Sequence, residues 1–416
     1  MRLRLAILSL LPGVCLLAAC GPDGAPRSGA SSTEPTSLRI ATYNIEDVRT
    51  VDVRNPEHPR LKKAAAAIQR LRPAILLINE MTYDQPGGPG YDASAGAGQN
   101  GKRFAETFLA VSQGEGLEPI MYRAFTAPTN TGLASGFDLD NDGRTVVEVP
   151  APAPPAPDGS PAAQTPADRA YGGDAWGFGT FPGQYGLALF VRDDLAILYD
   201  DVRTFRLLPW ARMPDALLPV DSGTGQPWYA GAEGEQFRLS SKSHWDVPVR
   251  LSDGRILHVL ASHPTPPAFD GDERRNVRRN HDEIRFWADY LADADYIVDD
   301  SSRAGGLAPD AFFVIMGDLN ADPDEGNAQD DPVGTWLLSH PRVNGTFVPQ
   351  ASREAVAAYP RLDPDDTAGW GLRVDYVLPS ADLTVIGGGI ARPLAADTVG
   401  VPASDHFPVW IDVEIP

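Results

Sequence analysis

A carboxylate and a carboxamide follow an apolar run in the C-terminal half of the sequence. Residues 312–316 read Phe-Phe-Val-Ile-Met, and Gly317-Asp318-Leu319-Asn320 comes directly after them. In an extended chain, side chains two positions apart point the same way, so Asp318 and Asn320 would face one space at a strand end. The alternative is a strand followed by an ordinary polar turn, because Asp, Asn and Gly also favour turns for local reasons.

Four other segments have the same form, an apolar run that ends in a polar group capable of catalysis. They are residues 38–44 with Asn44, 74–80 with Glu80, 256–263 with His263, and 401–410 with Asp405 and His406. Phosphate-ester hydrolysis needs a metal to neutralise oxygen charge, a base to activate water, and donors for the developing charge. The residue types at these strand ends suit that chemistry.

With Arg373-Val374-Asp375-Tyr376, the order of these motifs resembles the endonuclease/exonuclease/phosphatase superfamily. This group includes pancreatic-type deoxyribonucleases, abasic-site endonucleases, inositol polyphosphate 5-phosphatases and neutral sphingomyelinases. The resemblance extends from about Leu38 to Pro416. It implies a four-layer α/β/β/α sandwich of two packed mixed β-sheets flanked by helices. The active site would lie at one end of the sheets.

The resemblance also implies a role for each motif residue. Glu80 and Asp405 would bind the metal, and Asn44 would support the metal or a phosphate oxygen. Hard oxygen ligands suit Mg²⁺ or Mn²⁺, or Ca²⁺, better than zinc. His406 would be the general base or a stabiliser of phosphate charge, with Asp375 as its partner.

The same resemblance implies that Asp318 and Asn320 orient the attacking water and bind the scissile phosphate. In the deoxyribonuclease-like branch, a histidine at the position of His263 contacts phosphate and leans on an acid from the preceding strand. Here the corresponding stretch supplies Tyr185 and no obvious acid. We therefore expect His263 to bind phosphate, and we assign it no role toward the leaving group.

An acidic loop is a candidate calcium site. Asp138, Asp140 and Asp142 alternate before Gly143, like the opening of a calcium-binding loop. The twelfth position holds Val149, so the loop is no EF-hand. The alternatives are a stand-alone calcium site, a substrate-side site or an acidic turn.

Basic residues near the His263 segment are candidates for phosphate binding. Arg275 and Arg279 belong to an arginine-rich stretch that begins a predicted helix over 274–291 and could grip phosphates. The alternative is a solvated helix face that makes salt bridges. Lys242 and His244 could line the same cleft.

The first 20 residues read as an export signal. Arg2 and Arg4 precede an apolar run, and Leu-Ala-Ala-Cys at 17–20 matches a bacterial lipoprotein cleavage box, which predicts lipidation at Cys20. An ordinary signal peptide or a membrane anchor is the alternative, although the run is short for a span. The only other cysteine is Cys15, so the mature domain would contain no disulfide.

The rest of the chain reads as a tether and one domain. Residues 21–37 are rich in Gly, Pro, Ser and Thr, as in a flexible tether, and residues 38–416 form the predicted domain. A helix is expected over 61–71, before Pro73. Residues 83–184 are expected to be a long Gly/Pro/Ala-rich loop insertion, partly polyproline-like.

The net charge is −21 for the full chain. Removal of Arg2 and Arg4 with the signal leaves 33 basic and 56 acidic residues, or −23. Such a balance opposes non-specific binding to duplex nucleic acid, where phosphate neutralisation dominates affinity. The expected partner is a small phosphate ester, and membrane contact is expected only through the lipid anchor.

These observations predict a metal-dependent phosphoric ester hydrolase at the cell surface or in the periplasm. Water would attack phosphorus directly, because the sequence offers no nucleophilic Ser, Cys or Thr constellation. One alternative is an extracellular nuclease with a basic groove. Another is a sphingomyelinase-like enzyme with exposed aromatics beside the cleft, for which Trp176, Phe178 and Phe181 are candidates. The least favoured alternative is an inactive binding module. The sequence assigns no oligomeric state.

Overall fold

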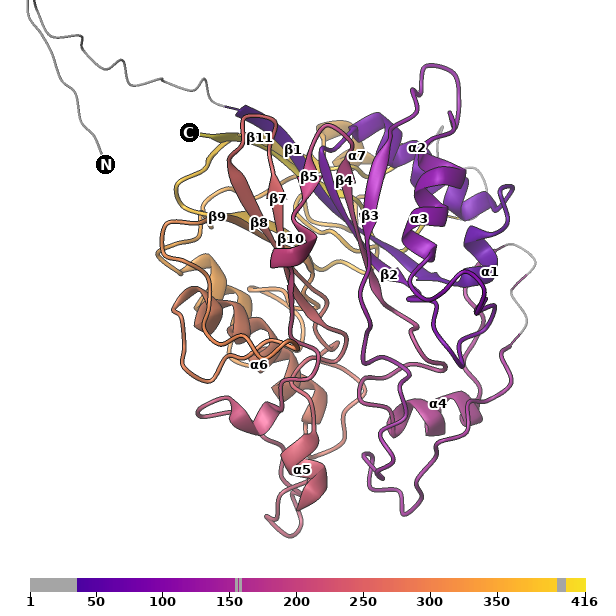
Figure 1. Cartoon of the computed structure of the whole chain (residues 1–416), viewed down its shortest axis with the longest axis vertical. Coiled ribbons are helices and arrows are strands. Elements are labelled where there is room, and N and C mark those ends of the chain that lie inside the picture. The colour runs from indigo at the N-terminus through magenta and orange to yellow at the C-terminus, as the bar shows by residue number, and fades with distance from the viewer. Residues whose placement is uncertain (1–35, 154–155, 157–158, 395–401) are drawn as a thin grey trace, which may run out of the picture. The chain divides into compact units, whose positions relative to one another are not determined.

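Two mixed β-sheets form the centre of the protein, which we describe from a computed structural model (Figure 1). The structure describes residues 36–153, 156, 159–394 and 402–416. The predicted signal segment, Cys20 and residues 21–35 of the predicted tether lie outside the described residues. In the described part of the chain, no helix has the length and apolar character that crossing a membrane requires.

Each sheet contains one parallel pair of strands among antiparallel neighbours. In spatial order, the first sheet consists of β11 (Thr384–Ile390), β12 (Val409–Ile415), β1 (Thr36–Val48), β2 (Ile75–Met81), β4 (Leu187–Arg192) and β3 (Tyr122–Phe125). The second consists of β10 (Asp375–Pro379), β9 (Phe312–Asp318), β8 (Ile256–Ser262), β7 (His244–Arg250) and β5 (Ala196–Ile197), and β6 (Arg203–Thr204) also pairs with β7. The parallel pairs are β1 with β2 and β8 with β9.

Helices flank the two sheets. They are α1 (Thr50–Val53), α2 (Pro59–Leu71), α3 (Asn100–Phe104), α4 (Pro166–Gly173), α5 (Ala232–Gln236), α6 (Arg275–Leu291) and α7 (Arg353–Ala358). Short π-helical turns are η1 (Ala105–Leu109) and η4 (Val333–Leu338), and 3₁₀ turns are η2 (Tyr199–Asp201) and η3 (Trp210–Arg212). In Figure 1, α2 and α3 lie on one side of the sheets and α6 lies on the other.

Three hydrophobic clusters show how these elements are layered. The central cluster lies between the sheets and includes Leu77 of the first and Val247 of the second. Another joins the outer face of the first sheet to α2 and η1. The third joins the outer face of the second sheet to α6 and η4. The predicted four-layer α/β/β/α sandwich is therefore confirmed.

The sequence of α2 explains where it begins and ends. Pro59 occupies the first turn, where backbone N–H groups have no partner within the helix, so the N–H that proline lacks is not needed. His58 Nδ1 accepts a hydrogen bond from Leu61 N at 3.5 Å. Arg72 adopts the left-handed conformation that ends the helix just before Pro73. The helix predicted over 61–71 is present and begins at Pro59.

The helix α6 packs against the second sheet and forms hydrogen bonds to two loops that adjoin this sheet. Its predicted apolar stripe is buried, with Ile284 and Trp287 fully enclosed. Glu283 on the same helix accepts hydrogen bonds from Ser241 N at 2.6 Å and from Thr265 N at 2.7 Å. The helix therefore positions the loop before β7 and the loop after β8.

Residues 83–184 are not only loop, in contrast to the prediction. They contain α3, η1, β3 and α4, and β3 pairs with β4 at the edge of the first sheet. A capping box starts α4, because Thr165 Oγ1 accepts from Asp168 N at 3.2 Å and Asp168 Oδ2 accepts from Thr165 N at 2.7 Å. At the other boundary, β1 starts at Thr36, before the predicted domain start, because Thr36 pairs with Ile415.

Strand pairing brings the polar strand ends together. Asn44 and Asn79 are register partners in the parallel pair β1–β2, and Asp318 and Asp375 are partners in the antiparallel pair β9–β10. His263 directly follows β8, which runs parallel to β9. Because the carboxyl ends of parallel strands meet at one edge of a sheet, each sheet presents its polar residues at a single end.

Candidate active site

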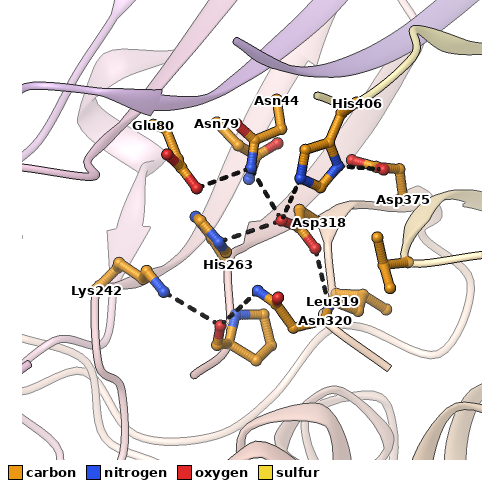
Figure 2. Close-up of polar contacts among 12 residues, drawn as sticks. Asn44, Asn79, Glu80, Lys242, His263, Asp318, Leu319, Asn320, Asp375 and His406 are labelled. Atoms are coloured by element: carbon orange, nitrogen blue, oxygen red, sulfur yellow. Dashed lines mark hydrogen bonds and ion pairs between the residues drawn. The ribbon is translucent and has the colours of Figure 1, made fainter. Parts of the chain in front are cut away.

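The polar ends of the two sheets meet at the side chain of Asn44 (Figure 2). Its Nδ2 donates to Glu80 Oε1 at 3.0 Å and to Asp318 Oδ2 at 2.9 Å. Its amide oxygen accepts a hydrogen bond from Glu46 N at 2.9 Å. In this orientation Asn44 bridges a carboxylate from each sheet, and its predicted part in metal or phosphate binding stays a prediction.

His406 and Asp375 form a buried pair. His406 Nδ1 lies 2.8 Å from Asp375 Oδ2, and His406 Nε2 lies 3.7 Å from Asp318 Oδ2 (Figure 2). Burial alone would favour the neutral ring, but Asp375 and Asp318 together raise the pKa of His406 above its ordinary value. The carboxylates on its two sides therefore favour the imidazolium form.

His263 approaches the same carboxylate from the second sheet. Its Nε2 lies 3.4 Å from Asp318 Oδ2, and its buried Nδ1 has no hydrogen-bond partner among the described residues. Burial, with the positive charge of Lys242, lowers the pKa of His263. Asp318 thus lies between a histidine that favours its charged form and one that favours its neutral form.

Asp318 itself is fully buried at the centre of these contacts. Burial would raise its pKa, but the neighbouring His263 and His406 and the hydrogen bond from Asn44 lower it below its usual range. Asn320 N also donates to Asp318 Oδ1 at 2.9 Å. Asp318 is therefore held as a carboxylate whose oxygens accept hydrogen bonds from several directions.

Strained backbone surrounds the site. Glu46, Asp47, Glu80 and Asn320 have φ values of 54°, 43°, 66° and 53°. Such left-handed conformations cost on the order of 1–3 kcal/mol for residues other than glycine and cluster at functional sites. The irregularity in β1 turns Asp47 N toward Glu80 Oε2, to which it donates at 2.9 Å. The strain therefore helps to fix the carboxylate of Glu80.

The donor set fits a hard divalent cation. Glu80, His263 and Asp318 offer ligand atoms that all lie within 4.8 Å of one another. Burial and the neighbouring Asp405 raise the pKa of Glu46 to about 7, which reflects a concentration of negative charge at this end of the sheets. The carboxylate oxygens of Glu80 and Asp318 suit Mg²⁺ or Mn²⁺. Glu80 and Asp318 are the residues that would hold the ion.

The predicted third ligand, Asp405, lies at the edge of this group. Its side chain is 46% exposed, and its Oδ1 is 4.0 Å from His406 Nε2. Burial raises its pKa, and the charges of Glu80 and Asp318 add to this effect. The charges of both carboxylates therefore act on Asp405, but Asp405 does not belong to the cluster of Glu80, His263 and Asp318.

Asn320 and Lys242 share one acceptor beside His263. The amide of Asn320 and the ammonium of Lys242 each donate to the Pro264 carbonyl at 3.2 Å (Figure 2). Burial lowers the pKa of Lys242, while Glu283 and Glu80 oppose that shift. The structure therefore brings Lys242 to the site, where its charge could offset that of a phosphate.

Three of the predicted phosphate-binding residues have structural roles instead. His244 Nδ1 lies 2.6 Å from Ser240 Oγ and its Nε2 lies 2.9 Å from the Glu283 carbonyl, so both nitrogens are occupied. Buried Arg279 donates to three backbone carbonyls of neighbouring loops. Arg275 donates to a backbone carbonyl and lies 3.5 Å from a glutamate. Burial decides the outcome for His244 and Arg279, and sequence spacing does not reveal it.

The acidic loop stays a candidate calcium site. Oxygens of Asp138, Asp140 and Asp142 lie within 4.8 Å of one another. Backbone N–H groups of the same loop donate to Asp138 and Asp140, as they would in an acidic turn without an ion. The calcium prediction and the acidic-turn alternative therefore both stand.

Two residues that the sequence did not single out connect the parts of the site. Asn79 accepts from Thr42 Oγ1 at 3.2 Å and donates to the Ser262 carbonyl at 3.5 Å, which links β2 to β8 of the other sheet. Ser404 Oγ donates to the Asn44 carbonyl at 2.7 Å and accepts from His406 N at 3.1 Å. Both residues lie next to predicted site residues in the sequence, and this position is the signal that could have identified them.

Comparison with known proteins places this arrangement in context. The sequence model of the endonuclease/exonuclease/phosphatase family matches residues 41–406. No curated protein matches the chain. A solved endonuclease/exonuclease/phosphatase from Beutenbergia cavernae DSM 12333 is 18% identical with a TM-score of 0.50, over 91% of this chain and 72% of that one. This likeness supports the fold alone.

Two further solved structures show weaker likeness. An endonuclease/exonuclease/phosphatase from Bacteroides vulgatus is 13% identical with a TM-score of 0.46, over 92% of this chain and 100% of that one. The human Nocturnin catalytic domain with bound sulfate anion is 14% identical with a TM-score of 0.42, over 91% of this chain and 94% of that one.

Proposed function

The chain belongs to the endonuclease/exonuclease/phosphatase family, whose members generally hydrolyse phosphate esters, and from this premise we propose that it is a metal-dependent phosphoesterase that activates water directly. One observation carries the proposal. The buried carboxylate of Asp318 lies within 3.7 Å of Asn44 Nδ2, His263 Nε2 and His406 Nε2, beside Glu80. This arrangement unites a cation site with groups that can accept and donate protons.

The two histidines support complementary roles in this chemistry. Environments that push the pKa values of two groups apart are typical of acid–base pairs. His406, held by Asp375 through Nδ1, would present a charged Nε2–H to a phosphate oxygen. His263, favoured in its neutral form, would bind phosphate or accept a proton at Nε2.

Asn44 and Asn320 hold the Asp318 carboxylate in place, and this carboxylate would orient the attacking water by accepting a hydrogen bond from it. A divalent cation held by Glu80 and Asp318 would supply neutralisation of charge on the phosphate oxygens. Lys242 would add positive charge beside His263. The buried surroundings strengthen each of these electrostatic contacts.

The experiment compares hydrolysis of a chromogenic phosphodiester and the corresponding monoester, with Mg²⁺, Mn²⁺ and Ca²⁺ in turn. Glu80→Gln is the control, because it keeps the shape of the side chain and removes its charge. We expect hydrolysis that depends on the metal and falls by about 100-fold or more in the variant. Equal rates in the variant, or no hydrolysis with any metal, would contradict the proposal.

A small phosphate ester is favoured over polymeric DNA as the substrate. Two of the arginines that could form a basic groove, Arg275 and Arg279, are bound to backbone carbonyls. The net charge of −21 also opposes duplex binding. A sphingomyelinase-like activity would need exposed aromatic residues beside the cleft. Of the three candidates, Trp176 and Phe181 are buried and only Phe178 is exposed.

We also propose that the enzyme acts outside the cytoplasm as a lipid-anchored protein. The proposal rests on the cleavage box that ends at Cys20 and on the polar composition of residues 21–37. Cys20→Ser should abolish incorporation of labelled fatty acid in cells. Labelling of this variant at the wild-type level would contradict the proposed anchor.

A further inference from the structure

An exposed tryptophan stands beside His406. The ring centroid of Trp370 lies 4.9 Å from that of His406, with the ring planes at 89°. Trp370 is 52% exposed, whereas His406 is buried. A tryptophan carries one of the largest apolar surfaces of any side chain, and about half of this one faces solvent. That surface is available to a ligand bound at His406.

Backbone hydrogen bonds fix the turn that carries Trp370. Gly371 N donates to the Ala368 carbonyl at 3.1 Å and closes the turn, and the φ of 86° at Gly371 is one that glycine adopts without strain. Gly369 N donates to the Asp405 carbonyl at 2.7 Å. The turn is therefore joined to the segment that contains His406.

The base of the turn is also joined to the partner of His406. Thr367 Oγ1 accepts a hydrogen bond from Asp375 N at 3.0 Å, and the Thr367 carbonyl accepts one from Phe407 N at 2.8 Å. The backbone that carries the indole is thus joined to both members of the histidine–aspartate pair, and the indole itself contacts the His406 ring. A ring fixed in advance loses little conformational freedom when a ligand packs against it.

We propose that Trp370 determines specificity by stacking on a planar aromatic group of the ester, so that aryl or single-nucleotide-sized phosphate esters are preferred. This inference rests on the proposed function. Gly369 N binds the backbone of Asp405, and the Asp405 side chain is 46% exposed, so a carboxylate lies close to the turn that carries the ring. A single flat ring near a carboxylate suits one aromatic group, whereas a lipid surface would need a continuous apolar patch.

A purely structural role predicts a different outcome. Asp375 already fixes the His406 ring through a 2.8 Å hydrogen bond. If Trp370 only supported His406, its loss would lower the affinity for all substrates equally. If Trp370 stacks on the ligand, its loss lowers the affinity for aromatic ligands selectively.

The test measures binding of phenylphosphonate and cyclohexylphosphonate by calorimetry in the presence of Mn²⁺. These probes carry the same charged group and differ in the flatness of the ring. We expect the wild-type protein to prefer phenylphosphonate by about 10-fold, Trp370→Ala to abolish that preference, and Trp370→Phe to retain most of it. The matched control is Tyr199→Ala, which removes an aromatic ring of similar exposure (56%) on η2.

Several outcomes would overturn the inference. The first is that the wild-type protein binds both probes equally well. The second is that Trp370→Ala still prefers phenylphosphonate. The third is that Trp370→Ala loses the same factor of affinity for both probes. Phosphonates are not hydrolysed, so the measurement needs no turnover. A preference that depends on Trp370 in a protein without esterase activity would refute the proposed function and leave the aromatic site standing.

Discussion

Replacement of Asp375 by asparagine changes the charge beside His406 while it keeps the shape of the side chain. Asp375 Oδ2 lies 2.8 Å from His406 Nδ1, and the two residues are 1% and 5% exposed. Asp375 and Asp318 raise the pKa of His406 to about 10 against the effect of burial. Among the charges that favour the imidazolium form, that of Asp375 has the largest effect.

The variant should lower the pKa of His406, because burial is then opposed only by the charges of Asp318 and Asp405. His406 would be charged at pH 7 in the wild-type protein and largely neutral in Asp375→Asn. The asparagine amide could also donate to Nδ1 and so fix the wrong tautomer. We expect kcat/KM to fall by about 10²- to 10⁴-fold.

The pKa is measured by a nuclear magnetic resonance titration of the histidine rings in the metal-free protein. His406→Gln identifies the resonance of His406. Asp382→Asn, which changes an exposed carboxylate beyond the other end of β10, is the matched control. An unchanged pKa of His406 in Asp375→Asn, or the same shift in Asp382→Asn, would refute the assigned pairing.

Three further predictions follow from the same contacts. Glu80→Gln should weaken Mn²⁺ binding by 10-fold or more in calorimetry, with an unchanged circular dichroism spectrum; wild-type affinity would exclude Glu80 as a ligand. Burial lowers the pKa of His244 to about 4, so the unfolded chain takes up a proton near pH 6.5 and the folded chain does not. Stability should therefore be complete above pH 6.5 and fall by about 3 kcal/mol as the pH drops to 4. In His244→Asn that part of the pH dependence should be missing from urea titrations, and an identical pH profile would contradict the assignment. Arg279→Met leaves three backbone carbonyls without their donor and should lower the free energy of unfolding by about 3 kcal/mol; a phosphate-binding role would instead raise KM and leave stability unchanged.

The sequence was sufficient to predict the architecture and several of the polar residues that the fold brings together. The signal comes from polar residues near the ends of the apolar strands β1, β2 and β9 (Asn44, Glu80 and Asp318) and from His406 just before β12, because the strand pairing of the family leaves few places where these residues can lie. The register of β9 and β10 then sets Asp318 opposite Asp375. These features depend on short local motifs, which a single sequence displays directly.

The sequence could not predict which polar groups would be buried for structural reasons. Arg279 and Lys242 are both cations near the same loops, but Arg279 binds backbone carbonyls and Lys242 reaches the site. The short strand β3 was hidden in a Gly- and Pro-rich segment, because only its pairing with β4 makes it a strand. Trp370 carried no signal in the sequence, since its importance comes from its exposure and its distance to His406.

The central claim is that a metal held by Glu80 and Asp318 enables hydrolysis in this site. The most direct measurement strips the protein with a chelator and then follows phosphodiester hydrolysis and Mn²⁺ binding in the same titration. Hydrolysis should rise in proportion to occupancy of one site, and both should be lost together in Glu80→Gln. Full activity in the stripped protein, or activity in Glu80→Gln that follows metal binding as in the wild type, would contradict the claim.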